Sequence, residues 1–525
     1  MDTAGGASDS MERRGIPQGL LDFFASPGGH SLIVRGAAGT GKTTFALQLA
    51  EELGHLTHAY YMSVRVSDVS LYNQFPWLKP KLERLQQLKV ARVQSARPAE
   101  KGMKAQAPAA NTEKHRLDRT ELRKLEGRIE MGAEGDESYG RVGEGEVAEN
   151  TVVFDLGSDL PEVDLAYDEV EKNLPERTLV LIDSIDALSE RYGVVASKLI
   201  NTLQKDLVES AAANVVYVLE SSTDTRLDYL GDGVLAFSTR EHAGRRARVM
   251  TLEKLRGAEI RQPKYLYSLA EGTLHAFPVS APSRPEKSAA WVPVPDPASG
   301  AVSTGNADLD KLCGGLPLGS IVALEVGKDV PSFCLDNLKL AVMANFVAQE
   351  RGVAYVPAQK ATAEIVREWL SPFIGGPALD KYLRIFEASP LGSFEGSAGA
   401  LRLEGQSVDT DLKWSALEHS LPEAKHPYLS FVAFDSLESV YGDRVLDAMT
   451  GHLSSVRRNR DVFLGIVGET NRSTGSLASF AHVHLRLENI DGTVVLYGQK
   501  PFTGLHVLSF DVGAGFPRAV LHPVA

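Results

Sequence analysis

One short segment combines glycines, a lysine and a hydroxyl group at a spacing that suits the binding of phosphate. Residues 36–43 read Gly-Ala-Ala-Gly-Thr-Gly-Lys-Thr and match the pattern G-x-x-x-x-G-K-[ST]. The glycines allow main-chain N–H groups to turn toward phosphate oxygens, and the start of the following helix adds partial positive charge. The alternative is a glycine-rich turn that holds no ligand. The motif predicts an ATP site formed by Gly36, Ala37, Ala38, Gly39, Thr40, Gly41, Lys42, Thr43 and Thr44.

Two acidic residues follow apolar runs that could bring them to the same site. Lys42 would reach the β- and γ-phosphates and the Thr43 hydroxyl would bind Mg²⁺. Asp183 ends the run 179–182 and could hold the same Mg²⁺ through water or through Thr43. It could instead cap the next helix, although Ser184 or Asp186 would serve there equally well. Glu220 ends another apolar run and could polarise a water molecule, or merely cap a turn.

The elements that must position these residues occur twice along the chain. An apolar run ends at a glycine and precedes a helical pattern at 31–53, and again at 320–351. Asp183 precedes Glu220 by 37 residues, and Asp435 precedes Glu469 by 34, each after an apolar run. Apolar strands that alternate with helices indicate a parallel sheet covered on both faces. We therefore predict an α/β fold with an internal duplication, each copy a mainly parallel twisted sheet with helices on both faces.

Changes of composition mark the boundaries between these parts. Residues 1–14 are polar and are expected to form a flexible tail. The first domain is predicted over 15–277, with a charged insertion at about 95–150 that we expect to be mostly disordered. Six prolines at 278–300 indicate a semi-rigid linker, and 301–525 forms the second domain.

Composition also restricts the compartment and the partners. The net charge of −13 argues against a general nucleic-acid binder. Two cysteines, Cys313 and Cys334, are too few for a disulfide framework and fit a reducing compartment. The first residues lack an apolar signal segment, and no apolar run approaches the roughly 20 residues of a membrane span. We expect a cytoplasmic protein that makes no membrane contact.

Several of these segments together resemble the KaiC-like branch of the RecA superfamily of P-loop ATPases. They are residues 36–43, the strand end Ile182-Asp183-Ser184, and the segment 252–257. The second half is similar to the entrance of a KaiC-type domain, with Thr304-Gly305, Leu309-Asp310 and residues 314–320. An intact loop followed by a degenerate copy is most similar to the GvpD-type gas-vesicle regulatory ATPases. The resemblance implies two tandem RecA-like domains.

The resemblance also implies a contact between subunits. In this branch, ATP lies between neighbouring subunits and a Lys-x-Arg pair reaches the γ-phosphate in trans. Here that pair would be Lys254 and Arg256, and the chain would self-associate into a ring or another oligomer. A cation supplied in trans neutralises charge that grows in the transition state. The alternative is a solvated β-hairpin with ordinary charges.

Two departures from the branch weaken the case for catalysis. Active KaiC-type domains carry paired glutamates after the second strand, but residues 61–67 contain none, so ATP hydrolysis is expected to be slow or to use another residue. In the second copy, residues 327–334 occupy the loop position, with Phe333 and Cys334 in place of lysine and threonine. We expect no ATP binding there. Asp435 is expected to be a structural cap, and Lys500 lies near the place of the trans lysine.

A basic cluster in the first half could bind a partner. It consists of Arg240, Arg245, Arg246 and Arg248, with only Glu241 opposing it. It could dock an acidic regulatory protein or nucleic acid beside the nucleotide, or it could be an exposed hairpin.

The leading hypothesis is a nucleotide-dependent regulator that acts through partner docking or assembly, with slow or no hydrolysis. The alternatives are a competent ATPase or KaiC-like autokinase that uses Glu220, and a recombination-mediator-type ATPase that binds single-stranded DNA.

Overall fold

The computed structural model describes residues 15–54, 57–63, 73, 75, 160–221, 225–358, 361–387, 399–412 and 419–525. The predicted tail at 1–14 and insertion at 95–150 lie outside these residues. The chain divides into two compact units, Met1–Arg65 with Asp155–Ala525, and Val66–Phe154. All the elements named below belong to the first unit.

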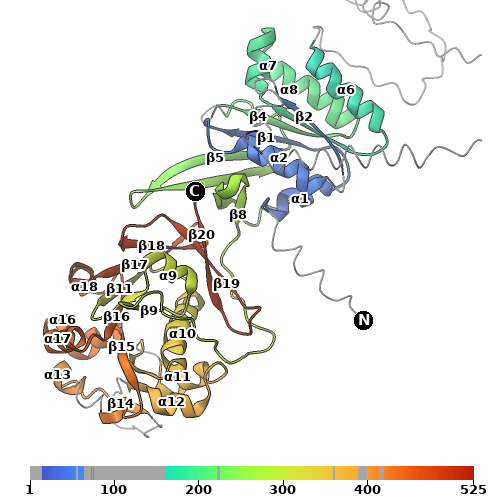
Figure 1. Ribbon diagram of the computed structural model, residues 1–525. Coiled ribbons are helices and arrows are strands. Elements are labelled where there is room, and N and C mark those ends of the chain that lie inside the picture. The colour runs from blue at the N-terminus through green and yellow to red at the C-terminus, as the bar shows by residue number, and fades with distance from the viewer. Residues whose placement is uncertain are drawn as a thin grey trace, which may run out of the picture. The chain divides into compact units, whose positions relative to one another are not determined.

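The first half folds around an eight-stranded sheet (Figure 1). Its first five strands are parallel and the last three are antiparallel. In spatial order they are β2 (His58–Ser63), β3 (Thr178–Asp183), β4 (Asn214–Leu219), β1 (Ser31–Gly36), β5 (Gly233–His242), β6 (Arg245–Leu255), β7 (Lys264–Ser268) and β8 (His275–Phe277).

Helices cover both faces of this sheet because its central strands are apolar on both sides. Leu32 and Val34 of β1 pack in one core with residues of α1 and α2, while Ile33 on the other face is also fully buried. On that side, α6 contacts β2 and β3, and α7 contacts β4. The helices are α1 (Gln18–Ala25), α2 (Lys42–Leu53), α6 (Pro161–Asn173), α7 (Ile185–Tyr192) and α8 (Ala196–Leu203), with a π-helical turn at Gln204–Ser210 and a 3₁₀ turn at Ala270–Gly272.

The second half repeats this plan in a ten-stranded sheet. Parallel pairing runs from β14 to β17, and the last three strands are antiparallel. In spatial order the strands are β14 (Ala400–Arg402), β13 (Leu383–Glu387), β12 (Arg351–Val356), β15 (Lys425–Ala433), β16 (Val462–Gly468), β11 (Ile321–Val326), β17 (Val483–Ile490), β18 (Thr493–Lys500), β19 (His506–Asp511) and β20 (Arg518–Pro523).

The strand orders confirm the predicted α/β fold with two mainly parallel sheets. From β12 to β20 the second sheet follows the order of the first from β2 to β8, with β13 and β14 added at one edge. A two-stranded ribbon precedes it, β9 (Ala301–Val302) with β10 (Leu316–Pro317). The helices of this half are α9 (Ala307–Cys313), α10 (Ser332–Ala348), α11 (Ala363–Leu370), α12 (Gly376–Tyr382), α13 (Val408–Asp411), α15 (Phe434–Tyr441), α16 (Val445–Ala448), α17 (Thr450–Asn459) and α18 (Thr474–Phe480). Within the described ranges, no helix combines the length and apolar character that a membrane crossing requires.

The proline-rich segment at 278–300 packs along the second half. Trp291 is 6% exposed, and its main-chain N–H donates to the carbonyl of Phe373. The Asn345 side chain of α10 accepts from the indole Nε1 of Trp291 and from the amide of Val294. Asp296 forms an ion pair with Arg351. Specific hydrogen bonds therefore hold the end of this segment against the second sheet.

The β5–β6 hairpin of the first half joins a small core with strands of the second half. Ala247 and Val249 of β6 cluster with Val495 and Tyr497 of β18. Arg245 is 5% exposed; its guanidinium donates to the carbonyls of Gly498 (2.6 Å) and Thr503 (2.6 Å) and lies over the rings of Tyr497 and Phe502. A buried cation thus fastens this hairpin to the second half.

We predict that Arg245→Ala destabilises the protein by about 3 kcal/mol, because buried carbonyls lose charged donors and a void opens between two rings. Urea unfolding followed by circular dichroism measures this change. The neighbouring Arg246 is exposed, so Arg246→Ala should change the free energy of unfolding by less than about 0.5 kcal/mol. Equal effects of the two substitutions would contradict the assignment of Arg245 as the anchor.

Candidate functional site

The loop at residues 36–43 connects β1 to α2 at the carboxyl edge of the first sheet. Strand β1 ends at Gly36 and α2 begins at Lys42, as the motif predicts. Gly39 and Gly41 have φ values of +75° and +95°, which side chains with a Cβ rarely adopt. A Cβ at Gly41 would also lie 2.8 Å from Leu269 Cδ1. These two glycines are therefore required by the shape of the loop.

Lys42 lies inside the curve of this loop. Its side chain is 8% exposed, and Nζ donates to the carbonyls of Gly36 (2.7 Å) and Ala37 (3.0 Å). Burial lowers the pKa of Lys42, while the nearby charges of Asp183, Glu220 and Asp186 act in the opposite direction. The ammonium group therefore lies at the loop, within the electrostatic influence of three carboxylates.

The main-chain amides of the same loop are available to a ligand. Among the residues that the structure describes, the N–H groups from Ala38 to Thr43 donate no hydrogen bond to any acceptor. Unpaired main-chain donors are rare in folded proteins, and they accumulate at helix N-termini, where they bind anions. The loop therefore combines several free donors with one ammonium group, which is a suitable arrangement for phosphate.

Asp183 lies next to the loop at the end of β3. Its Oδ2 accepts hydrogen bonds from Thr43 Oγ1 (2.6 Å) and from the Tyr61 hydroxyl (3.0 Å). The helix cap that Asp183 could have formed is provided by Ser184, whose Oγ accepts from the amide of Ala187 (3.3 Å). The peptide bond between Asp183 and Ser184 is cis. Asp183 is thus directed at Thr43 and away from α7.

Glu220 lies beside Asp183, immediately after β4. Its Oε1 accepts from Ser184 Oγ (3.2 Å), and its main-chain N–H donates to Asp186 Oδ2 (2.6 Å). Parallel pairing of β1, β3 and β4 explains why their ends meet, since Gly36, Asp183 and Leu219 all lie at the same edge. Three of the residues selected from the sequence, Lys42, Asp183 and Glu220, therefore converge.

The oxygen ligands at this edge of the sheet suit Mg²⁺ better than a metal that needs three or more protein side chains. The described residues contain no cluster of three or more His, Cys, Asp or Glu that could hold a metal ion. Mg²⁺ uses one or two protein oxygens together with phosphate and water. The Thr43 hydroxyl and the Asp183 carboxylate are hydrogen-bonded to each other and meet that requirement.

The predicted trans pair lies away from the phosphate-binding loop of its own chain. Lys254 pairs with Val234 near the start of β5, whereas Gly36 pairs with Phe237. Lys254 Nζ donates to the carbonyl of Gly231 (2.5 Å), and Arg256 binds Asp232 (2.9 Å). Any contact of this pair with phosphate would require another chain.

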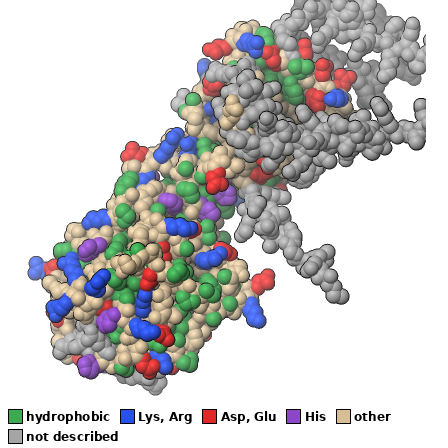
Figure 2. Space-filling view, in the orientation of Figure 1, with side chains coloured by type: hydrophobic (Ala, Val, Ile, Leu, Met, Phe, Trp, Pro, Cys, Tyr) green, Lys and Arg blue, Asp and Glu red, His purple; other side chains and the backbone are tan. Residues whose placement is uncertain are grey.

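Three of the four arginines in the predicted partner-binding cluster bind groups of their own chain. Arg240 pairs with Asp491 (2.7 Å), and Arg245 is the buried anchor described above. Arg248 donates from Nη1 to the carbonyl of Gly39 in the loop (3.2 Å) and from Nε to the main-chain oxygen of Ala525 (2.6 Å). Arg246 is exposed. On the face shown in Figure 2, basic side chains are scattered among neutral, acidic and histidine side chains.

The corresponding loop of the second half, residues 327–334, differs from the first in its residues and in part of its hydrogen bonding. The N–H of Gly327 donates to Leu487 (2.8 Å) and that of Val330 to Gly327 (3.2 Å), while Pro331 has no N–H. Cys334 is fully buried, and burial raises its pKa to about 12. Asp435, expected to be a cap, instead lies in the first turn of α15, whose N-cap Ala433 forms no side-chain hydrogen bond.

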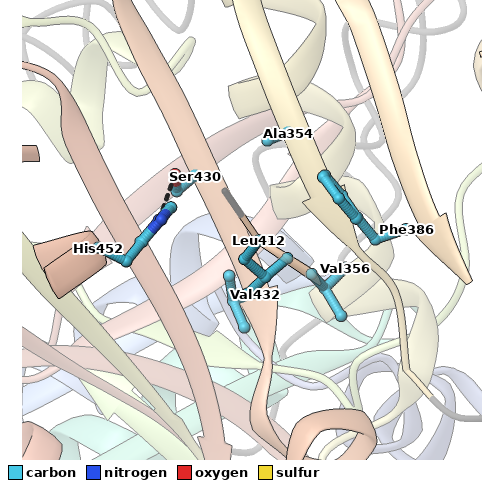
Figure 3. Close-up of a pocket in the computed structure, with 7 residues that line it drawn as sticks. All are labelled: Ala354, Val356, Phe386, Leu412, Ser430, Val432 and His452. Carbon is cyan, nitrogen blue, oxygen red and sulfur yellow. Dashed lines mark hydrogen bonds between the residues drawn. The ribbon is translucent and has the colours of Figure 1, made fainter. Parts of the chain in front are cut away.

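A small hollow in the second half contains a buried Ser–His pair (Figure 3). Ser430 Oγ lies 3.1 Å from His452 Nε2, and burial lowers the pKa of His452 to about 4. Its other lining residues are all apolar, namely Ala354, Val356, Phe386, Leu412 and Val432. A neutral histidine in such a lining is part of the core, and we assign it no chemistry.

Sequence reasoning missed two residues that contact the loop or its aspartate. Tyr61 binds Asp183, and the Tyr267 hydroxyl donates to the carbonyl of Thr40 (2.6 Å). Both lie on strands whose pairing brings them to the edge, and nothing in their local sequence distinguishes them from other strand tyrosines.

Comparison with known proteins shows that the chain is similar to gas-vesicle proteins. Residues 20–99 and 129–253 match the family "GvpD gas vesicle protein, P-loop domain", and residues 290–522 match "GvpD basic region 2". Protein GvpD2 of Halobacterium salinarum is 26% identical over 530 residues, and Protein GvpD1 of the same organism is 22% identical over 565 residues. Each alignment covers 96% of both chains. The chain is thus similar to GvpD proteins along most of its length, and its first half matches their P-loop domain.

Proposed function

We propose that this chain is a regulator of gas-vesicle formation in the cytoplasm, switched by ATP and Mg²⁺ bound at the loop of its first half. The observation that carries the proposal is the set of free amides around the Lys42 ammonium group. The GvpD relatives supply the biological context.

The chemistry of the switch follows from the partners of Lys42. Without a ligand, Nζ binds the carbonyls of Gly36 and Ala37. The β- and γ-phosphates would offer charged acceptors to the same ammonium group, and such hydrogen bonds are about twice as strong as neutral ones. Lys42 would then leave the carbonyls, and the amides would close around the phosphates. Thr43 and Asp183 would hold Mg²⁺.

Slow hydrolysis fits the residues at the end of β2. Tyr61, Met62 and Ser63 end this strand, and Ser63 lies beside Asp183 in the sheet. None of the three carries a carboxylate that could activate water. A long-lived ATP state suits a regulator better than a rapid catalyst.

The second half can respond to the loop through Arg248. This one guanidinium binds Gly39 of the loop and Ala525, which follows β20. A change in the loop therefore has a direct path to the end of the second sheet. We propose that this path changes how the chain assembles or docks a regulatory protein partner, with Lys254 and Arg256 available to a neighbouring subunit.

The ATP claim predicts a thermal shift that depends on Lys42. A ligand at 100 times its dissociation constant adds about 2.7 kcal/mol to the stability of the state that binds it. ATP with Mg²⁺ should raise the melting temperature of the wild type and leave that of Lys42→Ala unchanged. Differential scanning fluorimetry of both proteins, each compared with its own ligand-free sample, makes the measurement. No shift in the wild type would refute the proposal.

The coupling claim predicts a response in the second half. ATP with Mg²⁺ should slow amide hydrogen exchange in residues 505–525 by about tenfold, within the usual range of coupling free energies. Arg248→Ala should still bind ATP but lose this slowing, whereas the exposed Arg246→Ala should keep it. Retention of the full response in Arg248→Ala would exclude Arg248 as the connection.

A competent ATPase is the second candidate, favoured by the position of Glu220 beside Ser184 and Lys42. A general base commonly contributes about 10²–10⁴ in rate. Our proposal predicts slow phosphate release that changes little in Glu220→Gln. A loss of about a hundredfold or more would favour the enzyme, with Glu220 as its base.

A further inference from the structure

Tyr61 donates to the carboxylate that the proposed function assigns to Mg²⁺. It lies on β2, which is paired with β3, and its hydroxyl is 3.0 Å from Asp183 Oδ2. Its ring is half-buried and packs against the core formed by α1, α2 and β1. The direction of this hydrogen bond is fixed by chemistry, because the phenolic hydroxyl donates and the carboxylate oxygen accepts.

The two oxygens of Asp183 have different surroundings. Oδ2 accepts from both Thr43 and Tyr61, which come from different elements. Among the described residues, none donates a hydrogen bond to Oδ1. Two donors on one oxygen fix the plane of the carboxylate and leave the other oxygen to accept water.

We propose that Tyr61 is a positioning residue for Mg²⁺: it holds Asp183 so that Oδ1 is free for the water shell of the ion. The inference rests on the proposed function. Thr43 alone would orient the Asp183 carboxylate less firmly, because its hydroxyl oxygen would itself bind the metal. Partners that orient a metal-binding group commonly change metal affinity by about 10–100-fold when they are removed.

The neighbouring Tyr60 provides a matched control. It is also half-buried on β2, one residue away, so its side chain points to the opposite face of the strand. Tyr60→Phe and Tyr61→Phe each remove one hydroxyl without altering ring packing.

The experiment is a calorimetric titration of the 525-residue chain with ATP, first in EDTA and then at increasing Mg²⁺ concentrations. Tyr61→Phe should need about tenfold more Mg²⁺ than the wild type to reach half of its gain in ATP affinity. Its ATP affinity in EDTA should stay within about twofold of the wild type, and Tyr60→Phe should match the wild type throughout. Asp183→Asn gives the reference for a damaged metal site.

The outcomes separate the two claims. An unchanged Mg²⁺ midpoint in Tyr61→Phe overturns the inference while the proposed function stands. An equal loss of affinity with and without Mg²⁺ also overturns it, because Tyr61 would then only support the fold. A wild-type chain that binds no ATP under either condition overturns the proposed function and this inference together.

Discussion

The ammonium group of Lys42, held by carbonyls of its own loop, is the interaction on which the first half is organised. Around it the amides of residues 38–43 have no acceptor among the described residues, and Asp183 and Glu220 contribute negative charge nearby. A buried cation is costly unless something compensates it. The carboxylates compensate the ammonium only in part, because they lie beyond ion-pair contact and bind other donors. The arrangement is therefore one that a polyphosphate with Mg²⁺ would complete, since it brings both negative oxygens and a cation for the carboxylates.

Comparing the two sheets distinguishes the features that the fold requires from those that ligand binding would require. Both sheets share their strand order, so the fold does not need a phosphate-binding loop. In the second half Phe333 and buried Cys334 stand in place of the lysine and the hydroxyl residue, and Pro331 in the same loop has no N–H to donate. That half instead provides a surface for the β5–β6 hairpin, where Arg245 and Arg240 find their partners. Through Arg248, the same hairpin also contacts the phosphate-binding loop.

Local patterns predicted the fold and the centre of the site. The loop motif, the apolar strands and the acidic residues at strand ends all depend on neighbours in sequence, and parallel pairing then places these ends together. The role of Arg245 could not be predicted, because the carbonyls of Gly498 and Thr503 become its acceptors only after the two halves pack. Tyr61 was missed for a similar reason, since its hydroxyl reaches Asp183 only because β2 pairs with β3. Ser184 was correctly weighed as the alternative cap, because serine at a helix start is a local signal.

The two residues of the proposed trans pair, Lys254 and Arg256, differ in how strongly their own chain holds them. Lys254 pairs with the second residue of β5, and Lys500 pairs with the second residue of β17. Both ammonium groups bind main-chain carbonyls just before those strands, at Gly231 and at Ala478. The second copy has no phosphate-binding lysine, so this carbonyl contact serves the fold in both halves. Arg256 differs, since its side chain is 64% exposed and its partner Asp232 also binds Ser31 at the start of β1. Removing Arg256 would leave Asp232 with other donors, so of the two cations Arg256 can reach a neighbouring chain at the lower cost to its own.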